Sequence, residues 1–285
     1  MISLDQQQSV VDLLEQYNMS HCNPVSTPMV ANLKLGAGTS SKEEMKDKPY
    51  AALVGSLLYL SQCTRPDIAF AVGVLCRFMQ QPGVEHWTAA KHVLRYLKGS
   101  AGMSLTYYSA DQVSGGLCGA VDADWGACIM TSKSTSGWGL WLCGGLVTWA
   151  SRKQTCVAQS TAEAEYIAVA EALKDVLFTQ QLLEELGSPA VTPTQLLEDN
   201  EACITIGSRP GTSARTRHIR RRYHFVKDHV HKGDVKLVPV ASADNPADLF
   251  TKPVSRDVFQ RLVKKLVQQW IAGGSDGETG GVTHM

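Results

Sequence analysis

A change in the spacing of hydrophobic residues near residue 116 constrains the fold of this chain more than any other feature. Short runs rich in Val, Leu, Cys and Trp predict three strands, at 116–122, 137–143 and 146–157. Because Gly144-Gly145 separates the last two runs, the three strands are expected to form an antiparallel meander. The order of the later elements then decides the class of fold.

The later elements alternate between helical and extended patterns. They are predicted as helix 161–186, strand 194–198, helix 200–207, helix 218–231, strand 235–240 and a last helix that begins within 245–251. Gly187 and Pro189 are the expected stop signals of the long helix. The resulting order, βββαβαβα, predicts an α/β unit with a mixed five-stranded sheet and flanking helices.

The first hundred residues have helical spacing instead. A helix is expected from Ser3 to about Tyr17, followed by a turn-rich linker at 23–28 and an exposed loop at 36–49. Three amphipathic helices are predicted at 50–60, 66–79 and 85–98. Together these segments predict a small helical unit in front of the sheet.

Composition places the chain among soluble globular proteins, with 285 residues, 44% of them hydrophobic, and a formal net charge of zero. A nucleic-acid partner would therefore have to be held by a local basic patch. The eight cysteines include no CxxC pair, which favours buried thiols in a reducing compartment. No apolar stretch is long enough to span a membrane and no secretion signal is recognisable, so an intracellular location is expected.

Four carboxylates fall where a predicted strand ends or a predicted helix begins. They are Asp122, Glu165, Asp199 and Asp248. Converging carboxylates repel one another unless a divalent cation lies between them, and such a site is suited to phosphodiester cleavage. The set predicts a metal site at one rim of the sheet.

Each of these residues also has a structural alternative. Asp122 could serve a turn, although Asp124, beside Trp125, fits that role better. Asp199 could cap the helix that follows it, and Asp248 could be stabilised by a helix dipole without any function. The prediction therefore depends on the four residues as a set.

Capping separates two candidates on the long helix. Ser160-Thr161-Ala162-Glu163 matches a capping box, which gives Glu163 a structural role. Glu165 lies about 200° further around the helix and is followed by Ala168 and Ala172, whose small side chains allow close approach to a sheet. Glu165 is therefore the predicted ligand.

One region of the chain is densely basic. Its candidate nucleic-acid-binding residues are Arg215, Arg217, Arg220, Arg221, Arg222, His224 and Lys227. On a helix, residues three and four apart share a face that could meet phosphates. A solvated charged surface is the alternative.

Several motifs of the chain resemble those of the ribonuclease H domain of copia-like LTR retrotransposon polyproteins. They are Val121-Asp122-Ala123-Asp124-Trp125, Lys133-Ser134-Thr135-Ser136-Gly137, the run from Gln159 to Ala168, Glu198-Asp199-Asn200, Thr216-Arg217-His218-Ile219, Arg222-Tyr223-His224-Phe225 and Ala247-Asp248-Leu249-Phe250-Thr251-Lys252-Pro253. Motifs such as Thr64-Arg65-Pro66-Asp67-Ile68 and Leu94-Arg95-Tyr96-Leu97-Lys98-Gly99 resemble the end of the reverse transcriptase that precedes this domain.

The resemblance implies a domain division and an activity. Residues 1–108 would be a helical remnant of the reverse-transcriptase thumb or connection, 109–256 a ribonuclease H-like domain, and 257–285 a terminal helix with a disordered tail. The family's catalytic quartet would correspond to Asp122, Glu165, Asp199 and Asp248. These would hold two Mg²⁺ ions, or Mn²⁺, about 4 Å apart and cleave the RNA strand of an RNA/DNA hybrid. Glu165 would also contact the ribose 2′-hydroxyl.

The sequence also bears on other functions. The chain lacks a Tyr-x-Asp-Asp motif, so no polymerase activity is expected from it, and a polymerase domain on another chain is a possible partner. The acids do not match the spacing of DEDD exonucleases, nor the final Glu of integrases. A catalytically inert, nucleic-acid-binding fragment of a degenerate retroelement stays open as the alternative, and the start of the chain, beyond the polymerase core, is consistent with it.

Overall fold

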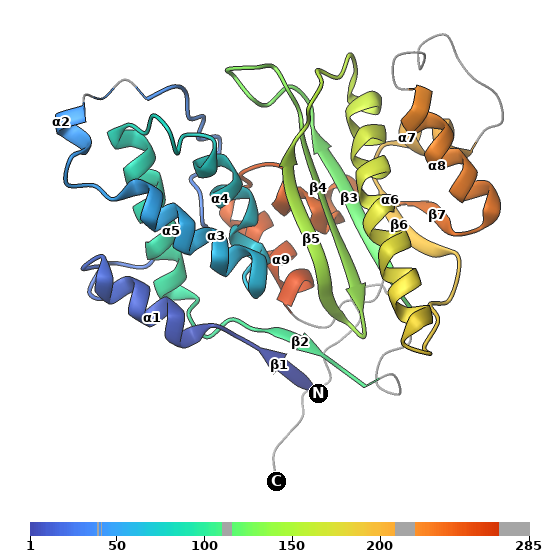
Figure 1. Cartoon of the computed structure of the whole chain (residues 1–285), viewed down its shortest axis with the longest axis horizontal. Helices are drawn as coiled ribbons and strands as arrows, with labels where there is room; N and C mark the ends of the chain where they lie inside the picture. Colours follow the sequence, from blue (N-terminus) through green and yellow to red (C-terminus); the bar gives the residue numbers. More distant parts are fainter. Residues whose placement is uncertain (39, 41, 110–115, 209–219, 268–285) are drawn as a thin grey trace.

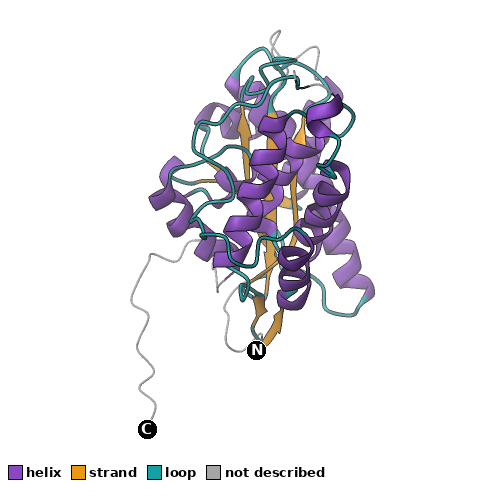
Figure 2. Cartoon of the chain, turned by 90° about the vertical axis from the view of Figure 1, so that its left-hand side faces the viewer, coloured by secondary structure: helices purple, strands orange, loops and turns teal. Residues whose placement is uncertain are grey.

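The computed structural model describes residues 1–38, 40, 42–109, 116–208 and 220–267. A helical unit lies on one side of a central sheet, and a long helix covers the opposite side (Figure 1). Seen from the side of the helical unit, helices lie in front of the strands (Figure 2). The sheet is therefore enclosed by helices on both faces.

The central sheet has five strands in the order β5-β4-β3-β6-β7. The strands are β3 (Cys118–Asp124), β4 (Thr135–Leu142), β5 (Gly145–Lys153), β6 (Thr194–Glu198) and β7 (Val235–Pro239). β3, β4 and β5 pair antiparallel, whereas β3, β6 and β7 pair parallel. This strand order and mixture of directions confirm the predicted ribonuclease H-like α/β fold.

Three helices cover one face of the sheet: α6 (Thr161–Glu185), α7 (Glu201–Ser208) and α8 (Arg220–Lys232). α6 begins where predicted, since Ser160 Oγ accepts a hydrogen bond from the Glu163 amide at 3.2 Å. It ends at the predicted Gly187, whose positive φ of 73° suits a residue without a side chain. These two signals set the length of the helix.

Adjacent residues of the strands point to opposite faces and enter different hydrophobic clusters. Val121 and Leu196 pack with α6, whereas Ala120 and Leu197 pack with the helical unit and the C-terminal helix. Both faces are therefore buried, which explains why the strands are hydrophobic runs without a polar alternation.

The helical unit contains the predicted helices with small differences at their ends. It consists of β1 (Ile2–Leu4), α1 (Gln7–Gln16), α2 (Lys42–Met45), α3 (Tyr50–Cys63), η1 (Pro66–Ile68), α4 (Ala69–Cys76), α5 (Val84–Gly99) and β2 (Leu105–Tyr107). The expected helix at 66–79 is split, because a 3₁₀ turn precedes α4. The small antiparallel pair β1-β2 was not predicted, since three-residue strands give too short a pattern to recognise.

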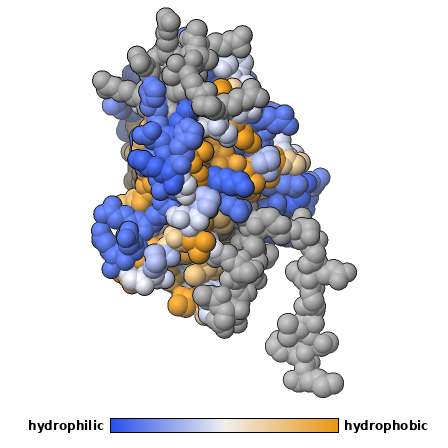
Figure 3. Space-filling model, turned by 90° about the vertical axis from the view of Figure 1, so that its right-hand side faces the viewer, coloured by the Kyte–Doolittle hydropathy of each residue, from blue (hydrophilic) through white to orange (hydrophobic). Residues whose placement is uncertain are grey.

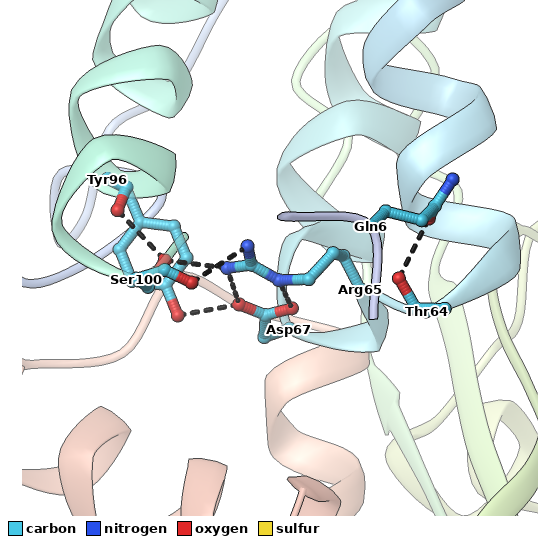
Figure 4. Close-up of polar contacts among 6 residues, drawn as sticks. All are labelled: Gln6, Thr64, Arg65, Asp67, Tyr96 and Ser100. Atoms are coloured by element: carbon cyan, nitrogen blue, oxygen red, sulfur yellow. Dashed lines mark hydrogen bonds and ion pairs between the residues drawn. The ribbon is translucent and has the colours of Figure 1, made fainter. Parts of the chain in front are cut away.

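A buried polar network ties η1 to α5 within the helical unit (Figure 4). Arg65, 1% exposed, donates to both carboxylate oxygens of Asp67, at 3.0 and 2.7 Å. Tyr96 donates to the same carboxylate at 2.6 Å, and Ser100 accepts from the guanidinium at 2.6 Å. The Arg65 charge is thus paired with a carboxylate that is itself fully hydrogen-bonded.

The chain after β7 differs most from the prediction. Two 3₁₀ helices, η3 (Ser242–Asp244) and η4 (Pro246–Phe250), stand where an α-helix was expected to begin, and α9 (Arg256–Val267) follows separately. η4 packs against the sheet at Gly137 of β4, where a Cβ atom would lie 2.6 Å from that of Phe250. The absence of a side chain at Gly137 lets η4 approach β4 closely.

The predicted domain division stays a prediction, since one hydrophobic cluster joins residues of the helical unit, of β4 and of α9. The predicted tail after residue 267 lies outside the described residues. Among the described helices, none is both long and apolar enough to cross a membrane. All eight cysteines are free thiols.

Candidate metal centre

The first carboxylate of the site, Asp122, lies near the end of β3 and is only 2% exposed. The Thr251 hydroxyl donates a hydrogen bond to Asp122 Oδ2. Just before it in β3, the Val121 carbonyl accepts from Asn245 Nδ2 at 2.9 Å. The segment that carries η4 is therefore fastened to the strand that carries Asp122.

Glu165 lies in the second turn of α6 and faces the sheet. It is 6% exposed, and its Oε2 atom has no hydrogen-bond partner among the described residues. Burial, together with the nearby Asp122, Glu198 and Asp199 carboxylates, raises the pKa of Glu165 to about 11. A buried carboxylate oxygen without a donor is costly unless a cation or a proton is supplied.

Glu163, the neighbouring candidate, has the predicted capping role. Its Oε2 accepts a hydrogen bond from the Gln159 amide at 2.8 Å, one residue before the N-cap residue that the capping-box pattern indicated. The two glutamates therefore have different roles: Glu163 caps the N-terminus of the helix, and Glu165 lies in the site.

Asp199 follows β6 directly and meets the first two residues. Asp122, Glu165 and Asp199 each offer an oxygen, and these oxygens lie within 4.8 Å of one another. The helix cap comes instead from Asn200, whose Oδ1 accepts from the Cys203 amide at 3.0 Å. The capping role considered for Asp199 thus belongs to its neighbour.

Asp248, the fourth predicted ligand, lies on η4 and outside this group of three. Its Oδ1 is 2.7 Å from Lys252 Nζ, which also lies 3.7 Å from Asp122 Oδ2. Burial and the Asp122 charge raise the pKa of Asp248 to about 7, although Lys252 opposes this effect. Asp248 is therefore linked to Asp122 through a shared lysine.

Sequence reasoning missed two ionisable residues of this site. Glu198 at the end of β6 is fully buried, and its Oε2 has no partner among the described residues. Burial raises the pKa of Glu198 to about 8, and the negative charges of Asp199 and Asp122 contribute to this increase. The hydrogen bond from the Asn200 amide has the opposite effect. Two features of the sequence could have predicted these residues: Glu198 directly precedes Asp199, and Lys252 follows Asp248 at i, i+4 spacing.

The donor set suits a hard divalent cation. All the candidate ligands are carboxylate oxygens, which Mg²⁺ and Mn²⁺ prefer. Among the described residues, three buried carboxylates have an oxygen without a hydrogen-bond partner, Glu165, Glu198 and Asp248, of which only the Asp248 oxygen has an ion-pair partner, Lys252. The residues present therefore fit a divalent metal site beside Lys252, whose ammonium group is paired with Asp248 and Asp122.

The predicted basic patch is described only in part. Arg215 and Arg217 lie outside the described residues, as do the side chains of Arg220 and Arg221. Arg222 lies 3.9 Å from Glu171 of α6, His224 is exposed, and Lys227 is 7% exposed. The side of the molecule that carries α7 and α8 mixes hydrophilic and hydrophobic residues (Figure 3). A nucleic-acid-binding role for this patch stays a prediction.

No family model matches the chain. The chain is 40% identical over 269 residues to the retrovirus-related Pol polyprotein from transposon TNT 1-94 of Nicotiana tabacum. This match covers 93% of the chain and 20% of the relative. It is 36% identical over 265 residues to the Pol polyprotein from transposon RE1 of Arabidopsis thaliana, covering 93% of this chain and 18% of the relative. The chain thus spans about a fifth of the length of these relatives.

Among solved structures, the chain is similar to the N-terminal ribonuclease H domain of a Mycobacterium tuberculosis protein. The identity is 15%, the TM-score is 0.35, and the match covers 52% of this chain and 97% of that domain.

Proposed function

Because the chain belongs to the family of retrovirus-related Pol polyproteins of copia-like transposons, we propose that it hydrolyses the RNA strand of RNA/DNA hybrids. In this proposal it is the ribonuclease H part of a retrotransposon's reverse-transcription machinery, and it cuts internal phosphodiester bonds. The catalytic residues are Asp122, Glu165, Asp199 and Asp248.

The observation that carries this proposal is the convergence of Asp122, Glu165 and Asp199 within 4.8 Å at one rim of the sheet. They come from β3, from α6 and from the end of β6, so they are far apart in the sequence. Divalent cations bound there would reduce the repulsion among the three carboxylates. They would also give a partner to Glu165 Oε2, which has none among the described residues.

The four carboxylates would hold two Mg²⁺ or Mn²⁺ ions, which when bound supply the charge that activates water and stabilises the departing 3′ oxygen. The protein's own groups have separate tasks. Thr251 orients the Asp122 carboxylate through its hydrogen bond, and Lys252 holds Asp248 next to Asp122. Glu165 contacts the ribose 2′-hydroxyl, which distinguishes RNA from DNA.

The proposal also includes partners and a location. The substrate is an RNA/DNA hybrid, held in part by the basic patch that includes Arg222 and His224. A reverse-transcriptase polymerase domain on another chain would supply DNA synthesis. The protein would act within the cell, in the cytoplasm, a virus-like particle or the nucleus.

A gel assay with an end-labelled RNA/DNA hybrid and Mg²⁺ tests the activity. Wild-type protein should cut the RNA strand and leave duplex DNA of the same sequence intact. Asp199→Asn and Glu165→Gln should lower the rate by about 10³-fold or more, because each removes a charged ligand that acts in the transition state.

Glu163→Gln is the matched control, since it makes the same chemical change two residues away and Gln retains the capping function. This variant should cut at nearly the wild-type rate. If neither wild type nor variants cut the hybrid, the activity is refuted and the inert nucleic-acid-binding alternative is favoured.

A further inference from the structure

A cavity of about 360 Å³ lies between the helical unit and the turn that joins β3 to β4. Residues 29–35, together with α4 and the two residues after it, form one side, and residues 127–131 form the other. The segment after η4, from Lys252 to Val254, borders it as well. The volume is typical of sites for small ligands.

The charged side chains around this cavity are predominantly basic. Those among its described lining residues are Lys34, Arg77, Lys153 and Lys252, against a single carboxylate, Asp124. Lys252 is already paired with Asp248 and Asp122, so Lys34, Arg77 and Lys153 against Asp124 leave an excess of two positive charges, in a chain with no formal net charge. An anion is therefore the expected occupant.

Arg77 is the residue that most strongly indicates an anion. Its Nη2 donates to Thr135 Oγ1 at 3.2 Å, and no carboxylate of the described chain lies within ion-pair distance of it. Burial lowers the pKa of Arg77, whereas the Cys128 side chain, with which the guanidinium also forms a hydrogen bond, opposes this effect. With no carboxylate beside it and only the Thr135 and Cys128 side chains as contacts, the half-buried guanidinium retains unused N–H donors in a planar fork, a geometry that matches phosphate oxygens.

The cavity adjoins the candidate metal centre. Lys252, which borders the cavity, reaches Asp248 and Asp122 at 2.7 and 3.7 Å. Asp124, on the cavity wall, lies two residues after Asp122 in β3. A strand with one phosphodiester at the carboxylates would therefore have a neighbouring phosphodiester close to the cavity.

An apolar wall stands opposite the turn. Phe70 and Phe78 are buried, and Val74 and Val254 are partly exposed. Ile129 and Met130, more than half exposed, lie on the turn itself. Apolar and aromatic groups of this kind can contact a ribose or a base regardless of the base sequence.

We propose that this cavity is a nucleotide subsite for a strand of the nucleic-acid substrate. A phosphodiester would bind to Arg77 and Lys34, and the attached nucleoside would pack against the wall formed by Phe70 and Val74. This inference rests on the proposed function, because it assumes that the substrate reaches the adjacent carboxylates.

Binding of a fluorescein-labelled RNA/DNA hybrid to the full chain, measured by anisotropy in EDTA, tests the subsite without any cleavage. Arg77→Gln should weaken binding about tenfold, since it removes charged hydrogen bonds to a phosphate. It should also reduce the dependence of log K on log salt by about 1. Lys34→Gln, at an exposed position, should give the same change in slope with a smaller loss of affinity.

The control is Lys46→Gln, which removes an equal charge from the same helical unit at a residue that does not line the cavity. It should bind like wild type. Unchanged affinity and slope in the Lys34 variant and in a folded Arg77 variant would overturn the subsite, as would undetectable wild-type binding. Wild-type binding without cleavage would instead contradict only the proposed activity.

Discussion

The helical unit and the rim of the sheet both bury carboxylates, but the two regions balance their charge differently. In the helical unit, Asp67 receives two hydrogen bonds from Arg65 and one from Tyr96. At the rim, Glu165 and Glu198 each keep an oxygen that receives no hydrogen bond from the part of the chain that the structure describes. The first arrangement is complete without a ligand, whereas the second becomes favourable only when protons or cations are added.

This difference separates a structural charge network from a binding site. A buried ion pair with all its hydrogen bonds satisfied needs nothing further, so its removal is expected to affect stability. A cluster of like charges lowers stability in the metal-free protein and is expected to affect binding and chemistry. Substitutions, metal binding and pH should therefore affect the two regions differently.

Asp67→Ala should lower the free energy of unfolding by about 3–5 kcal/mol, because it leaves the Arg65 charge buried and unpaired. Urea denaturation measures the effect. Asp12→Ala, at an exposed position of α1, is the control and should change stability by less than about 0.5 kcal/mol. A small effect of Asp67→Ala would show that the network is not required for stability.

Mg²⁺ should stabilise the wild-type protein, by about 2.7 kcal/mol when its free concentration is a hundred times the dissociation constant. The cause is that the folded state brings Asp122, Glu165 and Asp199 together and the unfolded state does not. Thermal unfolding with Mg²⁺ and with EDTA measures this. The same stabilisation in Asp199→Asn would contradict a role for Asp199 as a ligand.

The metal-free protein should lose stability as pH rises from about 5 to about 8, on the order of 2 kcal/mol. Burial and neighbouring carboxylates raise the pKa of Asp248 to about 7 and of Glu198 to about 8. The folded state therefore binds more protons than the unfolded state in this range, and each raised pKa makes folding less favourable as pH increases. Urea titrations in EDTA at several pH values measure the slope, and a rise in stability would contradict the expected shifts.

Glu165→Gln should stabilise the metal-free protein at pH 7 by about 1 kcal/mol. The pKa of Glu165 is raised to about 11, so its carboxylate must take up a proton when the protein folds at pH 7, whereas the neutral amide of Gln does not. The gain should disappear near pH 4.5, where the unfolded glutamate is also protonated. Glu163→Gln serves as the comparison and should show no such dependence on pH. Destabilisation by Glu165→Gln would indicate that this side chain has a partner in the folded protein.

Much of the fold follows from local patterns. Hydrophobic spacing predicted the five strands of the sheet and the long helix α6 within a few residues, because both faces of the sheet are buried and the chain changes period sharply. The capping pattern predicted that Glu163 caps α6 and that Glu165 faces the sheet, because capping depends on residues within one turn. The short elements β1, β2 and η4 were not predicted, because three to five residues give too little hydrophobic periodicity to recognise.

The sequence alone determined which carboxylates are candidates and which end of each element they occupy, because secondary structure and its ends are set by neighbouring residues. How these carboxylates meet depends on the packing of the folded chain: Asp248 joins Asp122 through Lys252, Asn200 caps α7 in place of Asp199, and Glu198 lies in the site. The cavity beside Arg77 likewise depends on packing between segments more than fifty residues apart. Such contacts depend on close packing in three dimensions, which no spacing along the chain specifies.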